Sequence, residues 1–147
     1  MSPIHQSSQH TILMAEDDED DRDLAQDAFR DAGLTGQIRF VLDGQELVDD
    51  LRRHAGSAHP ERPDIVLLDL NMPRKDGREA LAEIRGDESL RGIPVVVLTT
   101  SRDQEEIRRS YRLGANSFIA KPVTHAELVD VMRELATYWF DVVELPG

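Results

Sequence analysis

The chain has 147 residues, contains no cysteine and carries a formal net charge of -12. This length fits a single domain, and the missing cysteines exclude disulfides, thiolate metal sites and cysteine nucleophiles. The strong negative charge argues against a nucleic-acid or anionic membrane partner. Because no segment has the ~18 apolar residues of a membrane span and residues 1–10 lack signal-peptide features, we expect a cytoplasmic protein.

Short β-rich runs alternate with segments that carry apolar residues at helical spacing. This alternation is typical of a parallel sheet covered by helices. We predict five strands, at residues 11–15, 38–42, 64–68, 94–98 and 117–119. The third and fourth strands contain the runs IVLL and VVVL, which are continuously apolar, as strands buried on both faces should be.

Five helices are predicted to alternate with these strands. The first closes at Gly33 in a left-handed cap, and the last begins with the capping-box pair Thr124 and Glu127. Residues 52–63 read as a long surface loop. The apolar faces of the five helices, in chain order, are Leu24, Ala28 and Ala32; Leu47, Val48 and Leu51; Ala80, Leu81 and Ile84; Ile107, Tyr111 and Leu113; and Leu128, Val131, Met132 and Leu135.

Charged and hydroxyl side chains follow four of the predicted strands. Glu16 and Asp17 follow the first, Asp69 the third, Thr99 the fourth and Lys121 the fifth. Because the carboxyl ends of parallel strands share one edge of the sheet, we expect these groups to converge there.

The chemistry of this edge points to a transferred phosphoryl group. Carboxylates this close repel one another, and a divalent cation is their natural compensation. Magnesium suits Asp17 and Asp69 as ligands, with Glu16 acting through water. Lys121 can pair with Asp69 and then with a phosphoryl oxygen, to which the Thr99 hydroxyl also donates. Asp69 is then a carboxylate nucleophile that forms an aspartyl phosphate.

Two interpretations other than the phosphoryl site apply to the acidic row MAEDDEDD. Acids suit the positive end of a helix, so we assign Glu19, Asp20 and Asp21 to solubility and to the helix dipole. A calcium loop that starts at Asp17 fails, because its sixth and twelfth positions hold arginine and alanine instead of glycine and glutamate.

Four segments carry a family resemblance: EDD at 16–18, LLDLNMPRKDG at 67–77, VLTTS at 97–101 and IAKP at 119–122. With them the chain resembles the receiver domain of two-component response regulators. The phrase LNMPRKDGREAL and the ending YWFDVVELPG are most similar to single-domain regulators that partner bacterial phytochrome kinases.

The resemblance implies a flavodoxin-like fold, a doubly wound (βα)5 three-layer α/β sandwich with sheet order 2-1-3-4-5. We expect a mobile N-terminal tail at residues 1–10, the receiver domain at 11–140 and a C-terminal tail at 141–147.

The same resemblance assigns the metal site and the acceptor. Asp69 is implied as the phosphoacceptor, and Asp17 as a direct magnesium ligand with Glu16 as its water-bridged partner. The backbone carbonyl of Asn71 is implied as a further ligand. Mn²⁺ or Ca²⁺ is expected to substitute for Mg²⁺.

The switch residues are also implied by the resemblance. Thr99 and Lys121 would contact the phosphoryl group, Thr99 would shift together with Phe118, and the bond between Lys121 and Pro122 would be cis. Phe118 stands where many relatives carry tyrosine, which removes a hydroxyl from the switch.

The functional hypothesis is a signalling phosphoacceptor that is not an enzyme and only assists its own magnesium-dependent phosphorylation and dephosphorylation. A sensor histidine kinase, a phytochrome among the candidates, would phosphorylate Asp69 and remodel the face of the fourth helix, fifth strand and fifth helix. We also expect a homodimer through the last helix and the aromatic residues Tyr138, Trp139 and Phe140.

Two alternatives remain open at this stage. The first is a metal-dependent phosphohydrolase with Asp69 as nucleophile, although Asn71 stands where such enzymes carry a general acid and the chain has no room for a cap domain. The second is a receiver fold that serves only as a scaffold.

Overall fold

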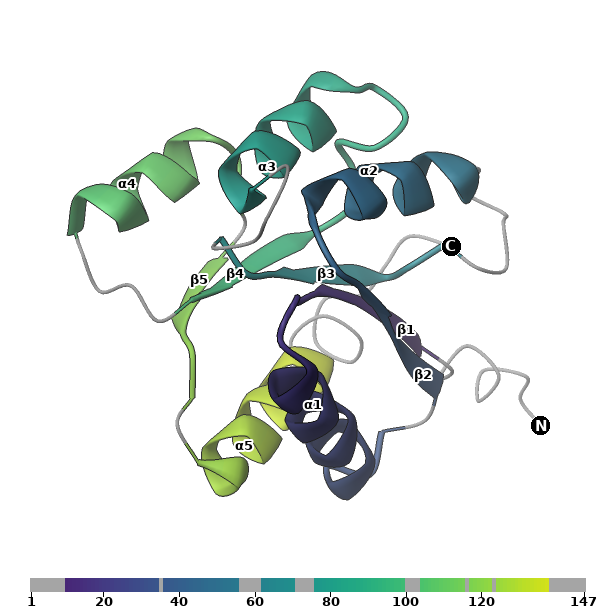
Figure 1. Cartoon of the computed structure of the whole chain (residues 1–147), viewed down its shortest axis with the longest axis vertical. Coiled ribbons are helices and arrows are strands. Elements are labelled where there is room, and N and C mark those ends of the chain that lie inside the picture. Colours follow the sequence, from purple (N-terminus) through teal and green to yellow (C-terminus); the bar gives the residue numbers. More distant parts are fainter. Residues whose placement is uncertain are drawn as a thin grey trace.

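The computed structural model describes residues 10–34, 36–55, 62–70, 76–99, 104–115, 117–122 and 124–137. Strands and helices alternate along these residues, as Figure 1 shows. The strands are β1 (His10–Ala15), β2 (Gly36–Val41), β3 (Ile65–Leu68), β4 (Val95–Thr99) and β5 (Ser117–Ala120). The helices are α1 (Glu19–Asp31), α2 (Gly44–Arg53), α3 (Gly77–Gly86), α4 (Gln104–Arg112) and α5 (His125–Ala136).

The strands form one parallel sheet in the order β2-β1-β3-β4-β5, which confirms the expected fold class. Helices α1 and α5 cover one face, and α2, α3 and α4 lie on the other (Figure 1). The chain therefore forms three layers, and all five strands point their carboxyl ends toward the same edge.

The central strand β3 is buried on both faces because alternate side chains enter two different cores. Ile65 and Leu67 pack in the core under α1 and α5, whereas Val66 and Leu68 pack in the core under α2 and α3. The continuous apolar run predicted as a doubly covered strand is confirmed.

Helix ends follow the predicted capping residues. Thr124 accepts a hydrogen bond from the Glu127 backbone N–H while the Glu127 side chain accepts from the Thr124 N–H, so the predicted capping box is confirmed. Gly33, just beyond the C-terminus of α1, has φ 77°, a left-handed conformation that glycine adopts without strain.

Two predicted helix faces are wrong in part. The Leu24 side chain is 47% exposed, and α1 instead buries Ala25, Ala28 and Phe29. The Tyr111 side chain of α4 is 49% exposed. In α1 the buried face is rotated by one residue from the predicted one, so that Ala25 and Phe29 pack inward in place of Leu24.

The boundaries differ from the predicted ones by a few residues. Strand β2 begins at Gly36 and ends at Val41, so Leu42 lies outside it and is 43% exposed. Helix α2 extends to Arg53, two residues into the predicted surface loop.

The expected cis bond between Lys121 and Pro122 is wrong, because no peptide bond among the described residues is cis. The trans form is the intrinsic preference of a bond to proline, by about 0.5–1 kcal/mol.

Several expectations fall outside the described residues. These are most of the N-terminal tail, the C-terminal tail, the aromatic run at 138–140 and the remainder of the loop at 56–61. Among the helices that are described, none has both the length and the apolar character required to cross a membrane.

Gly77, the first residue of α3, packs against the chain segment that leaves β3. A Cβ at this position would lie 2.6 Å from the backbone oxygen of Asp69 and 2.7 Å from Cα of Leu70. Because both neighbours are backbone atoms, Gly77→Ala must displace the segment that carries Asp69. We expect a loss of about 1–3 kcal/mol in the free energy of unfolding, measured by urea denaturation.

Gly86, at the end of the same helix, is the matched control. A Cβ added there meets nothing within 4 Å. We expect Gly86→Ala to leave stability unchanged or to raise it by less than about 1 kcal/mol, because alanine restricts the unfolded chain. Equal stability of the two variants would contradict the close backbone contact at Gly77.

Candidate functional site

The backbone around the site is held by hydrogen bonds that continue the sheet beyond the ends of its strands. The Glu16 N–H donates to the carbonyl of Val41 at 3.0 Å, and the Asp69 N–H donates to the carbonyl of Ala15 at 3.2 Å. Glu16 and Asp69 therefore have fixed positions just beyond the ends of the neighbouring strands β1 and β3.

Three carboxylates meet at this edge. One oxygen from each of Glu16, Asp17 and Asp69 lies within 4.8 Å of the other two. Glu16 and Asp69 are buried, with 1% and 8% exposure, and Asp17 is exposed to solvent. Two buried acids and one open to water make a set of hard oxygen donors that fits a hydrated divalent cation of the magnesium or calcium type.

The Lys121 ammonium lies beside these carboxylates. Its Nζ donates to Glu16 Oε1 at 2.6 Å, to Asp21 Oδ2 at 2.8 Å and to Asp69 Oδ2 at 3.1 Å. The predicted contact between Lys121 and Asp69 is therefore present, although they are 52 residues apart in the sequence. The two shorter contacts go to other acids.

Burial and charge act in opposite directions on the ionisation of this cluster. Burial raises the pKa of Glu16 to about 7; the hydrogen bond from Lys121 opposes the rise and the charge on Asp69 adds to it. Burial alone would lower the pKa of Lys121. Hydrogen bonds to Asp21 and Glu16 and the charge on Asp69 outweigh burial and hold that pKa above its usual value. The single ammonium therefore offsets the repulsion and burial of the acids only in part. The part that is not offset keeps the pKa of Glu16 above its usual value.

The other predicted site residues are placed only in part. Thr99 is the last residue of β4, and its backbone lies opposite Ala120 of β5, next to Lys121. Phe118 lies in β5 opposite Val97. The side chains of Thr99 and Phe118, and the whole of Asn71, lie outside what the structure describes.

The contact between Asp21 and Lys121 is not predicted by the sequence, which places Asp21 with the acids that serve solubility and the helix dipole. The sequence does not distinguish it from Glu19 and Asp20, but its place in the fold explains the contact. Asp18 is the N-cap of α1, and its side chain accepts from the Asp21 N–H at 3.1 Å, so Asp21 lies in the first helical turn. Because α1 starts at this edge of the sheet, Asp21 in its first turn can face the edge and reach Lys121.

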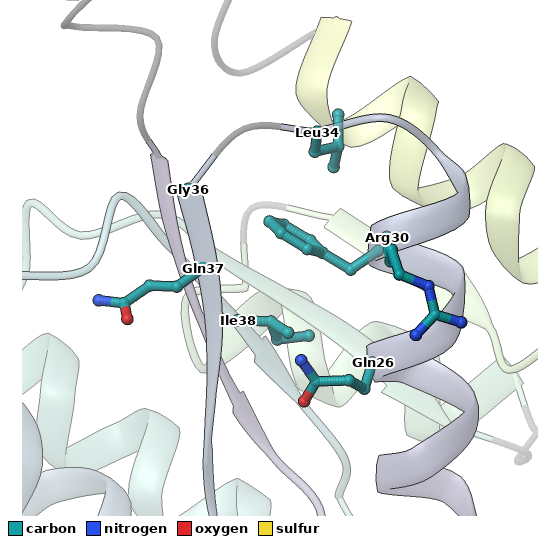
Figure 2. A pocket seen from close by; sticks show the side chains of 7 residues that line it. Gln26, Arg30, Leu34, Gly36, Gln37 and Ile38 are labelled. Carbon is teal, nitrogen blue, oxygen red and sulfur yellow. The ribbon is translucent and has the colours of Figure 1, made fainter.

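A cavity of about 420 Å³ lies elsewhere, between α1 and the start of β2 (Figure 2). Gln26 and Ile38 extend into the space between the helix and the strand, whereas Gln37 points away from the helix. Its lining includes Gly36, the first residue of β2, so this cavity is at the opposite end of the sheet from the carboxylates. It does not contribute to the candidate site.

The chain is similar in sequence and in structure to known proteins. Residues 12–133 match the family model described as "Response regulator receiver domain". The "Probable methanogenesis regulatory protein FilR2" of Methanothrix harundinacea is 40% identical over 136 residues, covering 92% of this chain and 87% of that protein.

Two further relatives have solved structures. "Response regulator Rcp1" of Synechocystis is 35% identical, with 92% of each chain covered. The solved structure of the Mn²⁺-bound form of response regulator Rcp1 is 34% identical, with a TM-score of 0.78, and the match covers 94% of this chain and 99% of that chain. The phosphorylated "Cyanobacterial Phytochrome Response Regulator RcpA" is 38% identical, with a TM-score of 0.83, covering 95% of this chain and 99% of RcpA.

These matches and the fold agree with the receiver resemblance, and they give no support to the phosphohydrolase alternative. The matched residues run from Ile12 in β1 to Arg133 in α5 and include every described residue of the carboxylate and lysine cluster. The chain therefore belongs to the response regulator receiver domain family, whose members act as phosphoacceptors in signalling.

Proposed function

We propose that this chain is a response regulator that accepts a phosphoryl group on Asp69 with the help of a bound divalent cation. The observation that carries the proposal is the meeting of Glu16, Asp17 and Asp69 oxygens within 4.8 Å, with the Lys121 ammonium 3.1 Å from Asp69. A nucleophile, a place for a cation and a fixed positive charge are thus adjacent.

The proposed donor is a phosphohistidine of a sensor kinase. A carboxylate oxygen of Asp69 attacks phosphorus, the new P–O bond forms as the P–N bond breaks, and the imidazole nitrogen keeps the electron pair and takes up a proton. Lys121 stays in place and donates to a phosphoryl oxygen, and the Thr99 hydroxyl is proposed to donate to another. The chain assists this transfer and the later hydrolysis, but it turns over no external substrate.

Asp17 and Asp69, together with the carbonyl of Asn71, are the proposed direct cation ligands, and Glu16 is proposed to act on the ion through a bound water. Mg²⁺ is the proposed physiological ion, with Mn²⁺ or Ca²⁺ able to substitute, because the donors are all oxygen. When bound, such an ion neutralises negative charge on the phosphoryl oxygens.

The proposed partner is a histidine kinase of the phytochrome class. Its support is the likeness to RcpA, which is named as a phytochrome response regulator. FilR2 carries a different role in its name at a similar identity, so the kinase class has to be tested directly. We further propose a cytoplasmic location and a homodimer through α5 and the aromatic residues Tyr138, Trp139 and Phe140.

The switch is proposed to work through Thr99 and Phe118, which stand opposite Ala120 and Val97 in the pairing of β4 with β5. A shift of the Thr99 hydroxyl toward the phosphoryl group would change the surface of α4, β5 and α5. This is a change in the populations of two states rather than a new fold.

Mass spectrometry after incubation with a small phosphodonor tests the proposal. With Mg²⁺ we expect one added phosphoryl group that hydroxylamine removes, as it does from an acyl phosphate. With a chelator in place of Mg²⁺ we expect little incorporation. An unmodified chain at saturating donor and Mg²⁺ would refute the proposal, and steady release of phosphate from many donor molecules would favour the hydrolase.

A further inference from the structure

Asp21 differs from its neighbours in the first turn of α1. Glu19 and Asp20 are exposed, whereas Asp21 is half-buried and its Oδ2 lies 2.8 Å from Lys121 Nζ. That distance is shorter than the 3.1 Å between the same ammonium and Asp69. A residue that the sequence assigns to the helix surface therefore contacts the lysine of the site.

The Lys121 ammonium has three N–H donors and no acceptor. It meets three carboxylates, so each N–H has one oxygen to bind. The three oxygens come from separate parts of the fold: Glu16 after β1, Asp21 in α1 and Asp69 after β3. The lysine itself follows β5, so a single cation joins four segments.

We propose that Asp21 is a positioning residue for Lys121. Together with Glu16 it takes two of the three N–H donors, and this leaves the third directed at Asp69 and at the phosphoryl group that Asp69 receives. The inference rests on the proposed function and adds to it a residue that acts through the lysine and does not touch the phosphoryl group.

The need for such a residue follows from the lysine side chain. Lysine carries its charge on a flexible four-carbon stem, and an unheld ammonium would sample several rotamers. Asp21 is well placed to restrict it, because the Asp18 cap fixes the Asp21 backbone at the helix start. Partly exposed ion pairs contribute little to stability, so we expect the effect of Asp21 on the reaction rather than on folding.

The role of Asp21 differs from a general effect of charge. Asp20 is the adjacent residue, carries the same charge at the same helix end and is exposed. Removing either acid takes one negative charge from the first turn of α1. Only the removal of Asp21 releases an N–H of Lys121.

The test is the rate of phosphoryl incorporation from acetyl phosphate into the full chain at saturating Mg²⁺. We expect Asp21→Ala to lower this rate about 5- to 10-fold, because the Lys121 ammonium loses part of its orientation. We expect Asp20→Ala to change the rate by less than about 2-fold. Asp21→Asn keeps an oxygen acceptor and should recover part of the rate. Circular dichroism is expected to show the same fold in all four proteins.

A double-mutant cycle shows whether Asp21 acts through the lysine. If it does, Asp21→Ala has no further effect on the low rate of a Lys121→Met chain. Equal rates for Asp21→Ala and Asp20→Ala would overturn the inference, as would an undiminished effect of Asp21→Ala in the Lys121→Met background. Failure of the proposed function has a different signature, since the unaltered chain would then take up no phosphoryl group.

Discussion

Asp69→Asn is expected to lower phosphoryl incorporation by at least about 100-fold, because an amide oxygen is a far weaker nucleophile than a carboxylate. Asparagine has nearly the same shape as aspartate, and its oxygen can still accept from Lys121. The loss should therefore reflect chemistry and leave the fold intact. Mass spectrometry after incubation with acetyl phosphate and Mg²⁺ measures the incorporation, and circular dichroism checks the fold.

Two matched variants separate a nucleophile from a neighbour that only binds the cation. Asp17→Asn removes a proposed ligand at the exposed side of the site, so its incorporation should be slow at low Mg²⁺ and recover as Mg²⁺ is raised. Asp20→Asn also removes one negative charge, at an exposed position in the first turn of α1, and it should behave as the unaltered chain. Incorporation into Asp69→Asn at an undiminished rate would show that another residue is the acceptor.

The sheet was predictable because its central strands leave little choice. A run such as IVLL, bounded by polar residues, fits a strand covered on both sides, and β3 is buried at every position. The helix faces were less predictable, as Leu24 shows. Periodicity indicates a helix, but the side that packs inward depends on how closely the helix can approach the sheet, which small residues such as Ala25 and Ala28 decide.

The meeting of the carboxylates was predictable from topology, since the carboxyl ends of parallel strands share an edge. Asp69 and Lys121 could be paired from the sequence for that reason. The contact of Asp21 with Lys121 could not, because it depends on where α1 begins and which way its first turn faces. Composition favours the dipole role for any acid at a helix start, and only the fold distinguishes Asp21 from Asp20.

Burial of Glu16 beside Asp69 opposes the ionisation of the Glu16 carboxyl, and this cost can be measured. Its carboxylate is surrounded by Lys121, Asp69 and Asp17, and the Arg22 guanidinium donates to its backbone carbonyl. Burial raises the pKa of Glu16 from 4.5 to about 7. Between these values the folded chain holds a proton that the unfolded chain has lost, so stability falls as pH rises through this window.

Glu16→Gln removes this titration while keeping an oxygen that can accept from Lys121. In a chelator, we expect the free energy of unfolding of the variant, relative to the unaltered chain, to rise by about 2–3 kcal/mol between pH 5 and pH 8. Urea denaturation at several pH values between 5 and 8, in buffer without added salt, measures this relative free energy of unfolding. Glu134→Gln, at an exposed position on α5, controls for the loss of one negative charge.

At pH 8, added Mg²⁺ should narrow the difference in free energy of unfolding between Glu16→Gln and the unaltered chain. The ion stabilises the unaltered chain more, because the variant lacks the Glu16 carboxylate that is proposed to act on the ion. A relative stability of Glu16→Gln that does not change with pH would mean that Glu16 is ionised to the same extent in the folded and unfolded chains. Lys121 would then compensate the buried carboxylate of Glu16 fully. The pH dependence therefore tests whether the resting site favours the ion that phosphoryl transfer requires.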